Sequence, residues 1–126
     1  MKKGNVLVVE DQKYVRSLLV DALDFFGYSP FEAKTPKEAL SLVEQKSVDL
    51  SIVDFNLPEM DGLRLAEELW RINPIIPVFL ISGMEEIGAK IKEKSQYLKG
   101  SLRFIEKPID LVILKHYLDG AMRCAS

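Results

Sequence analysis

The chain contains two kinds of apolar segment that follow each other in turn. Short continuous apolar runs rich in β-branched residues predict strands that are buried on both faces, as in a parallel sheet. Longer segments in which apolar residues recur every three or four positions predict amphipathic helices. The predicted strands are residues 6–9, 29–33, 50–54, 78–81 and 103–106.

Start and stop signals divide the helical segments. The first helix carries apolar residues from Val15 to Phe26, and Gly27 stands at the usual stopping position. The second opens with Thr35 as its cap and Pro36 at its first position, and Glu38 is expected to complete a capping box. These signals predict two helices that each begin and end sharply.

Three further helical segments are predicted with unequal strength. A third helix begins near Leu63 and ends before Pro74, and a last helix runs from about Asp110 to Met122. The segment 84–101 has only Ile87, Ala89 and Ile91 at helical positions, with Gly88 between them. That segment predicts a short helix at most.

Alternating strands and helices favour an α/β fold with a parallel sheet covered on both faces. At 126 residues the chain has room for one domain, residues 1–126, which is either a stand-alone protein or part of a longer one. Hydrophobic residues make up 48% and charged residues 29%, which favours a globular core over disorder.

The net charge and the cysteine content limit which binding partners and which cellular compartment are expected. A net charge of −2 gives no electrostatic basis for binding nucleic acid directly. The first apolar run, Val6–Val9, is shorter than the roughly 7–15 apolar residues of a signal peptide, and no run approaches the ~18 that suggest a membrane span. The single cysteine, Cys124, cannot form an intramolecular disulfide, so a cytoplasmic location is the default expectation.

Polar residues stand where the predicted strands end. Glu10 and Asp11 follow the first strand, and Asp54 ends the third. Ser82 follows the fourth, and Lys107 follows the fifth. Because the carboxyl ends of parallel strands lie along one edge of the sheet, residues far apart in sequence are expected to meet there.

A cluster of carboxylates at one edge predicts a metal-assisted phosphoryl-transfer site. At about 4 Å and an effective dielectric near 20, each pair of like charges costs on the order of 4 kcal/mol, which a divalent cation would offset. Hard oxygen ligands favour Mg²⁺, and Lys107 and Ser82 supply donors for phosphate oxygens. Each residue alone could equally cap a helix, form a turn or end a strand. Only their joint position supports the site.

These residues resemble the response-regulator receiver family of two-component signalling. Glu10-Asp11 is similar to the acidic pair of that family, and residues 54–62 (Asp-Phe-Asn-Leu-Pro-Glu-Met-Asp-Gly) are similar to its phosphorylation loop. Ser82 stands where the family has Thr or Ser, Lys107 precedes a proline as in the family, and Phe104 stands at its switching aromatic position. The resemblance covers essentially the whole chain and implies a flavodoxin-like sheet of order 2-1-3-4-5 with five helices.

The resemblance also implies a role for each matching residue. Asp54 accepts a phosphoryl group from a histidine kinase or a phosphotransfer protein. Mg²⁺ is bound by Asp11, Asp54 and the backbone carbonyl of Asn56, with Glu10 acting directly or through water. Lys107 and Ser82 bind the phosphoryl oxygens. The domain is a signalling module and not a conventional enzyme, because it catalyses only its own phosphorylation and dephosphorylation.

Phosphorylation is expected to switch the face made by the fourth helix, the fifth strand and the fifth helix. Ser82 moves toward the new phosphoryl group, and Phe104 turns into the vacated space. The resemblance implies a downstream effector domain or protein, or a homodimer, bound through that face. Ser82 in place of the commoner Thr, and a long segment between Ser82 and Lys107, depart from the family pattern.

Three rival functions stay open at this point. A flavin binder needs a hydroxyl- and glycine-rich loop after the first strand, where this chain has Glu10-Asp11. An aspartyl phosphatase usually has a second acid two residues after the nucleophile, where this chain has Asn56. The third rival is a receiver used only for protein docking. His116 is expected at the surface, Trp70 in or beside the core, and Lys90, Lys92, Lys94 and Lys99 on a solvated face.

Overall fold

A single five-stranded parallel sheet forms the centre of the molecule. The computed structural model describes residues 2–83 and 101–125. The strands are β1 (Asn5–Val9), β2 (Ser29–Ala33), β3 (Leu50–Asp54), β4 (Val78–Ser82) and β5 (Leu102–Glu106). All neighbouring pairs are parallel and the order is β2-β1-β3-β4-β5. The expected strand order is therefore confirmed, and so is the edge position of the proline-containing strand.

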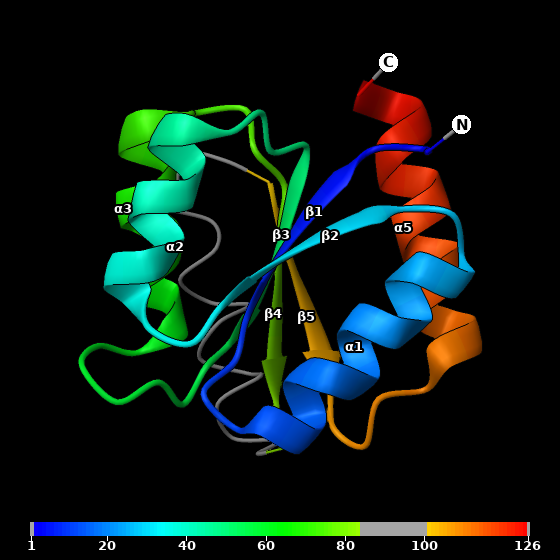
Figure 1. Ribbon diagram of the computed structural model, residues 1–126, viewed down its shortest axis with the longest axis horizontal. Helices are drawn as coiled ribbons and strands as arrows, with labels where there is room; N and C mark the ends of the chain where they lie inside the picture. The colour runs from blue at the N-terminus through cyan, green and yellow to red at the C-terminus, as the bar shows by residue number, and fades with distance from the viewer. Residues whose placement is uncertain (1, 84–100, 126) are drawn as a thin grey trace.

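Helices cover both faces of this sheet (Figure 1). The described helices are α1 (Lys13–Phe25), α2 (Pro36–Gln45), α3 (Gly62–Ile72) and α5 (Leu111–Ala125). α2 and α3 lie on one face, and α1 and α5 lie on the other. A flavodoxin-like, doubly wound α/β fold is confirmed. The helix expected within 84–101 falls on residues 84–100, which lie outside the described residues, as do the four lysines between 90 and 99.

Two hydrophobic clusters, one on each face, hold the helices to the sheet. Within β1, Leu7 and Val9 contribute to the cluster under α2 and α3, while Val6 and Val8 contribute to the cluster under α1 and α5. Every residue of β3 and β4 is buried. Burial on both sides explains why these strands have continuous apolar sequences and do not alternate.

The helix starts and stops largely follow the sequence signals. Gly27 follows α1 with φ of +94°, a left-handed conformation that glycine adopts without strain. The Thr35 side chain accepts a hydrogen bond from the Glu38 backbone N–H at 3.2 Å. The expected capping box differs in its second half, because the Glu38 carboxylate accepts from the backbone N–H of Lys34 at 2.7 Å, one residue before the cap.

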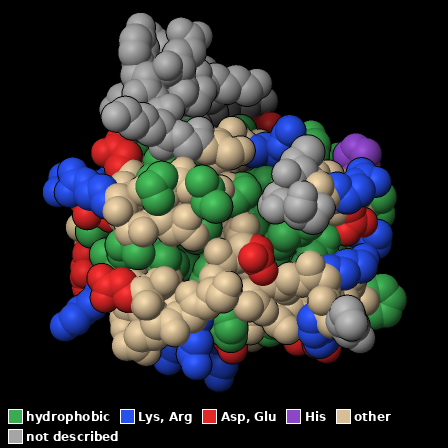
Figure 2. All heavy atoms as spheres, turned by 90° about the horizontal axis from the view of Figure 1, so that it is seen from above, with side chains coloured by type: hydrophobic (Ala, Val, Ile, Leu, Met, Phe, Trp, Pro, Cys, Tyr) green, Lys and Arg blue, Asp and Glu red, His purple; other side chains and the backbone are tan. Residues whose placement is uncertain are grey.

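The surface carries mixed charges. In Figure 2, which views the molecule from above Figure 1, Lys and Arg side chains are interspersed with Asp and Glu around the rim. His116 is exposed on α5, and Trp70 is buried with its indole N–H donating to the Ile76 carbonyl at 2.7 Å. Among the described residues, no helix is long and apolar enough to span a bilayer.

Candidate functional site

The carboxyl ends of the strands bring the predicted polar residues to one edge of the sheet. The strands point toward the lower edge in Figure 1, where β3 ends at Asp54 and β4 ends at Ser82. Asp54 is in register with Ile81 on the neighbouring strand. The Lys107 backbone N–H donates to the Ser82 carbonyl at 2.8 Å, which fixes the start of the β5–α5 loop beside the end of β4.

Three carboxylates form a compact cluster at this edge. Ligand oxygens of Glu10, Asp11 and Asp54 all lie within 4.8 Å of one another. Glu10 and Asp54 are 1% and 4% exposed, whereas Asp11 faces solvent. The Lys107 ammonium lies 3.4 Å from Asp54 Oδ2 and 3.9 Å from Glu10 Oε2. The Lys107 ammonium therefore lies beside two buried carboxyl groups, one at the end of β3 and one directly after β1.

The loop after β3 holds the Asp54 side chain in place. Asp54 Oδ1 accepts a hydrogen bond from the Asn56 backbone N–H at 3.2 Å, and the Phe55 N–H donates to the Ile81 carbonyl at 2.8 Å. The loop closes where the Gly62 N–H donates to the Phe55 carbonyl at 2.8 Å. Asp61 then caps α3 by accepting from the Arg64 N–H at 2.8 Å. The Asp54 carboxylate is thus held by a hydrogen bond from its own loop.

The donor set fits a hard divalent cation. Oε2 of Glu10 is buried and has no hydrogen-bond partner among the described residues, although such groups are normally paired. The candidate ligands Glu10, Asp11 and Asp54 all offer carboxylate oxygens, and Mg²⁺ favours oxygen ligands over nitrogen or sulfur. A cation at this position would satisfy the orphaned oxygen and reduce the repulsion among the carboxylates.

The pKa of Glu10 reflects the same crowding. Burial, reinforced by the neighbouring Asp54 carboxyl, raises the pKa of Glu10 from 4.5 to about 8. The Gln12 backbone N–H, which donates to Glu10 Oε1 at 3.1 Å, and the Lys107 ammonium act in the opposite direction. Without a metal, the folded protein therefore holds a proton at this carboxyl near neutral pH, whereas the unfolded chain does not.

The raised pKa of Glu10 predicts that the stability of the metal-free protein depends on pH. Since the folded pKa is raised, the contribution of Glu10 to the free energy of unfolding is fully present below pH 4.5 and is lost as pH rises through about 8. The loss over that window should be on the order of a few kcal/mol. Urea unfolding in EDTA at several pH values, for the wild type and Glu10→Gln, measures it. Equal pH slopes for the two proteins would contradict the prediction.

Sequence reasoning missed a buried arginine beside the cluster. Arg16 is 5% exposed, and its guanidinium donates to the main-chain carbonyl of Glu10 at 2.9 Å. Its position, three and seven residues before Leu19 and Leu23, puts it on the inward stripe of α1. An arginine at an apolar position of a helix, five residues after an acidic pair, was the available signal.

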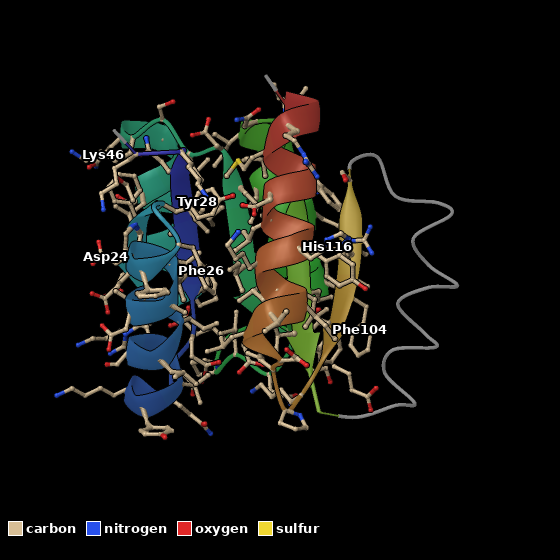
Figure 3. All side chains as sticks on the ribbon, turned by 90° about the vertical axis from the view of Figure 1, so that its right-hand side faces the viewer. Asp24, Phe26, Tyr28, Lys46, Phe104 and His116 are labelled. Carbon is tan, nitrogen blue, oxygen red and sulfur yellow. The ribbon has the colours of Figure 1, made fainter. Side chains whose placement is uncertain are left out.

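The two predicted switch residues lie on adjacent strands. Ser82, at the end of β4, is fully buried. Phe104 is half-buried on β5 and packs against the cluster on the α2 and α3 face, while its neighbour Ile105 belongs to the opposite cluster. Figure 3 places Phe104 on β5, beside α5, which carries His116. The helix expected to complete this face lies outside the described residues.

Comparisons of this chain with known protein families and solved structures agree with this architecture. A family model described as response regulator receiver domain matches residues 6–119. The transcriptional regulatory protein GlrR of Escherichia coli (strain K12) is 31% identical over 121 residues, which are 96% of this chain and 27% of GlrR. The receiver domain of the hybrid histidine kinase CckA is 30% identical, with a TM-score of 0.78 over 94% of this chain and 99% of that one.

A second solved structure supports the fold alone. The CheY-like receiver domain protein from Methanospirillum hungatei JF-1 has a TM-score of 0.86 and covers 97% of this chain and 95% of that one, at 22% identity. The chain spans about a quarter of the length of the first curated relatives that it matches, GlrR and QseF. Those whole proteins contain parts that have no counterpart here.

Proposed function

The chain belongs to the response regulator receiver domain family of two-component systems, and from that premise we propose that Asp54 is its phosphorylation site. The donor is a phosphohistidine on a histidine kinase or a phosphotransfer protein. An Asp54 carboxylate oxygen attacks phosphorus, and the P–N bond to the donor imidazole breaks with its electron pair returning to the ring nitrogen, which takes a proton from solvent as the imidazole leaves. The product is an aspartyl phosphate.

One observation carries this proposal. Asp54 is buried at the end of a central strand, with an ammonium at 3.4 Å and two further carboxylates within 4.8 Å. A buried carboxylate that only capped a loop would need neither neighbour. Phosphoryl transfer does need both, because its catalysis consists mainly of positioning and of neutralising charge on the transferred oxygens.

We assign the remaining polar residues to charge neutralisation. Asp11, Asp54 and the Asn56 carbonyl would hold Mg²⁺, with Glu10 acting directly or through water. The ion would supply positive charge to the phosphoryl oxygens. Lys107 is placed to bind one phosphoryl oxygen, since its ammonium already lies beside Asp54 Oδ2. The Ser82 hydroxyl, on the adjacent strand, would donate to another.

The same proposal gives a route from phosphorylation to output. A phosphoryl group adds charge and acceptor oxygens at Asp54, which would draw the Ser82 hydroxyl toward it. Phe104 stands on the neighbouring strand, half-buried, and would turn into the space that Ser82 leaves. The face of β5 and α5 would then favour a second conformation and bind an effector domain, an effector protein or another copy of the chain.

The proposal also covers the location of the protein, its domain organisation and its expected partners. A cytoplasmic location is proposed because the chain has a single cysteine, which allows no internal disulfide. We also propose that residues 1–126 form a single domain. The family match to residues 6–119 and the single central sheet support this. Direct binding of nucleic acid by this domain is not expected at a net charge of −2.

Labelling with acetyl phosphate tests the function. Intact mass spectrometry should detect one added phosphoryl group in the presence of Mg²⁺ and none in EDTA. A flavin binder would gain no phosphoryl group, and an aspartyl phosphatase would turn the donor over without a stable adduct. A docking-only receiver would also stay unlabelled. Absence of labelling at saturating Mg²⁺ and excess donor would therefore overturn the proposed function.

A further inference from the structure

Arg16 occupies an unusual place for an arginine. It lies on the inward face of α1, 5% exposed, next to the acidic cluster but without a contact shorter than 4 Å to any of the three carboxylates of that cluster. Arginines are rarely this buried unless their donors are satisfied. Its burial therefore calls for partners other than the site carboxylates.

Those partners are main-chain atoms of the acidic pair. One terminal nitrogen of Arg16 donates to the Glu10 carbonyl at 2.9 Å and lies 3.4 Å from the Asp11 carbonyl. Its Nε donates to Glu32 on β2 at 3.3 Å. The guanidinium thus joins α1, the loop after β1 and the edge strand through one rigid, planar group.

The rest of the loop has few other restraints. The Glu10 N–H donates to the Ala33 carbonyl at 3.1 Å, which extends the β1–β2 pairing by one step. The Gln12 N–H donates to the Glu10 side chain, which is itself a candidate metal ligand. Among the described residues, Arg16 is the one side chain that donates hydrogen bonds to the carbonyls of Glu10 and Asp11. Arg16 therefore restrains the main chain of Glu10 and Asp11 from the carbonyl side.

We propose that Arg16 is a positioning residue that fixes the acidic pair in the geometry required to bind a divalent cation. This inference rests on the proposed function of the site. It goes beyond that function by assigning the orientation of Glu10 and Asp11 to a residue that would touch neither the cation nor the phosphoryl group.

Charge and positioning predict opposite results, which makes the inference testable. A guanidinium near the cluster repels an incoming cation, so its removal should tighten Mg²⁺ binding if charge were its whole effect. If Arg16 positions the ligands, its removal should weaken Mg²⁺ binding. Loss of a group that orients metal ligands typically lowers metal affinity about 10–100-fold.

The experiment uses the 126-residue chain with MgCl₂ as the titrant, followed by isothermal titration calorimetry at pH 8. Arg16→Met should bind Mg²⁺ roughly 10–100-fold more weakly than the wild type. Arg16→Lys keeps the charge but not the planar donor pair, and it should also bind more weakly. Arg71→Met, which removes one positive charge from the exposed end of α3, should bind like the wild type.

A second readout separates positioning from general destabilisation. The Mg²⁺ concentration for half-maximal labelling by acetyl phosphate should rise by the same factor as the dissociation constant, while the labelling rate at saturating Mg²⁺ stays near that of the wild type. A residue that only stabilised the fold would lower the melting temperature equally with and without Mg²⁺. Loss of Arg16 should instead also reduce the increase in melting temperature that a fixed Mg²⁺ concentration produces.

The outcomes are distinct. Equal or tighter Mg²⁺ binding by Arg16→Met would overturn the inference, and so would wild-type binding by Arg16→Lys, which decides the matter if the methionine variant does not fold. A wild-type chain that binds no Mg²⁺ and takes no phosphoryl group would overturn the proposed function itself. A wild type that does both, with unaffected Arg16 variants, would overturn only the role of Arg16.

Discussion

Asp54→Asn should yield a folded protein that takes no phosphoryl group from acetyl phosphate at any Mg²⁺ concentration. The amide is nearly isosteric with the carboxylate but is a poor nucleophile toward phosphorus. Its oxygen can still accept the hydrogen bond from the Asn56 N–H. The Lys107 backbone keeps its position from the hydrogen bond to the Ser82 carbonyl. The expected loss is therefore chemical, and intact mass spectrometry measures it directly.

Stability measurements on the same variant provide an independent check. Removing one charge from the carboxylate cluster relieves like-charge repulsion on the order of 1–4 kcal/mol, so the metal-free protein should be at least as stable in urea unfolding although the ion pair with Lys107 is lost. Asp21→Ala, which removes an exposed carboxylate from α1, should label like the wild type and unfold at nearly the same urea concentration. Full labelling of Asp54→Asn would mean that a different residue is the acceptor.

The variant also tests the conformational switch. Beryllofluoride mimics a phosphoryl group on a carboxylate, and in the wild type it should perturb the NMR signals of Phe104 on β5 and Tyr117 on α5. With Asp54→Asn those perturbations should vanish. Unchanged beryllofluoride-dependent shifts in the variant would show that the β5–α5 face responds to something other than Asp54.

The sequence predicted the architecture well because burial in a parallel sheet leaves a strong pattern. β3 and β4 are buried on both faces, so their apolar runs and their polar ends were both visible. Topology then sufficed to place Asp54 and Lys107 together, since parallel strands end at one edge. Strand order thus places both residues at one edge, while the 3.4 Å between the Lys107 ammonium and Asp54 Oδ2 also depends on the reach of the lysine side chain.

Features that depend on side-chain reach were less predictable. Glu38 was expected to bond the N–H of Thr35, but its flexible side chain reaches the N–H of Lys34 instead. Arg16 lies on the same face of α1 as the buried apolar residues. A search for apolar residues at helical spacing therefore does not identify it as buried. The raised pKa of Glu10 depends on burial and on the distance to Asp54, neither of which spacing reports.

Gly62→Ala should have the largest effect on stability of any conservative change near the site. A Cβ atom at Gly62 would lie 2.5 Å from the Asp54 carbonyl oxygen, 2.7 Å from Leu80 Cδ1 and 2.9 Å from Phe55 Cα. Two of these three atoms belong to the backbone of Asp54 and Phe55, which cannot rotate away as a side chain can. Alanine would ordinarily favour a helix over glycine by about 1 kcal/mol, so the clash must exceed that gain.

The control for Gly62→Ala lies in another helix of the same molecule. Apart from its own neighbours in α5, Gly120 has no atom of the described residues within 4 Å of an added Cβ, so Gly120→Ala should be neutral or stabilise the protein by up to about 1 kcal/mol. Gly62→Ala should instead destabilise it by about 3 kcal/mol, or roughly 10 °C in melting temperature. It should also slow labelling at Asp54, because relief of the clash moves the backbone that carries the nucleophile. Equal stabilities for the two variants would mean that the loop after β3 yields freely, and the positions of Asp54 and Phe55 would then not be fixed by their packing against Gly62 at the start of α3.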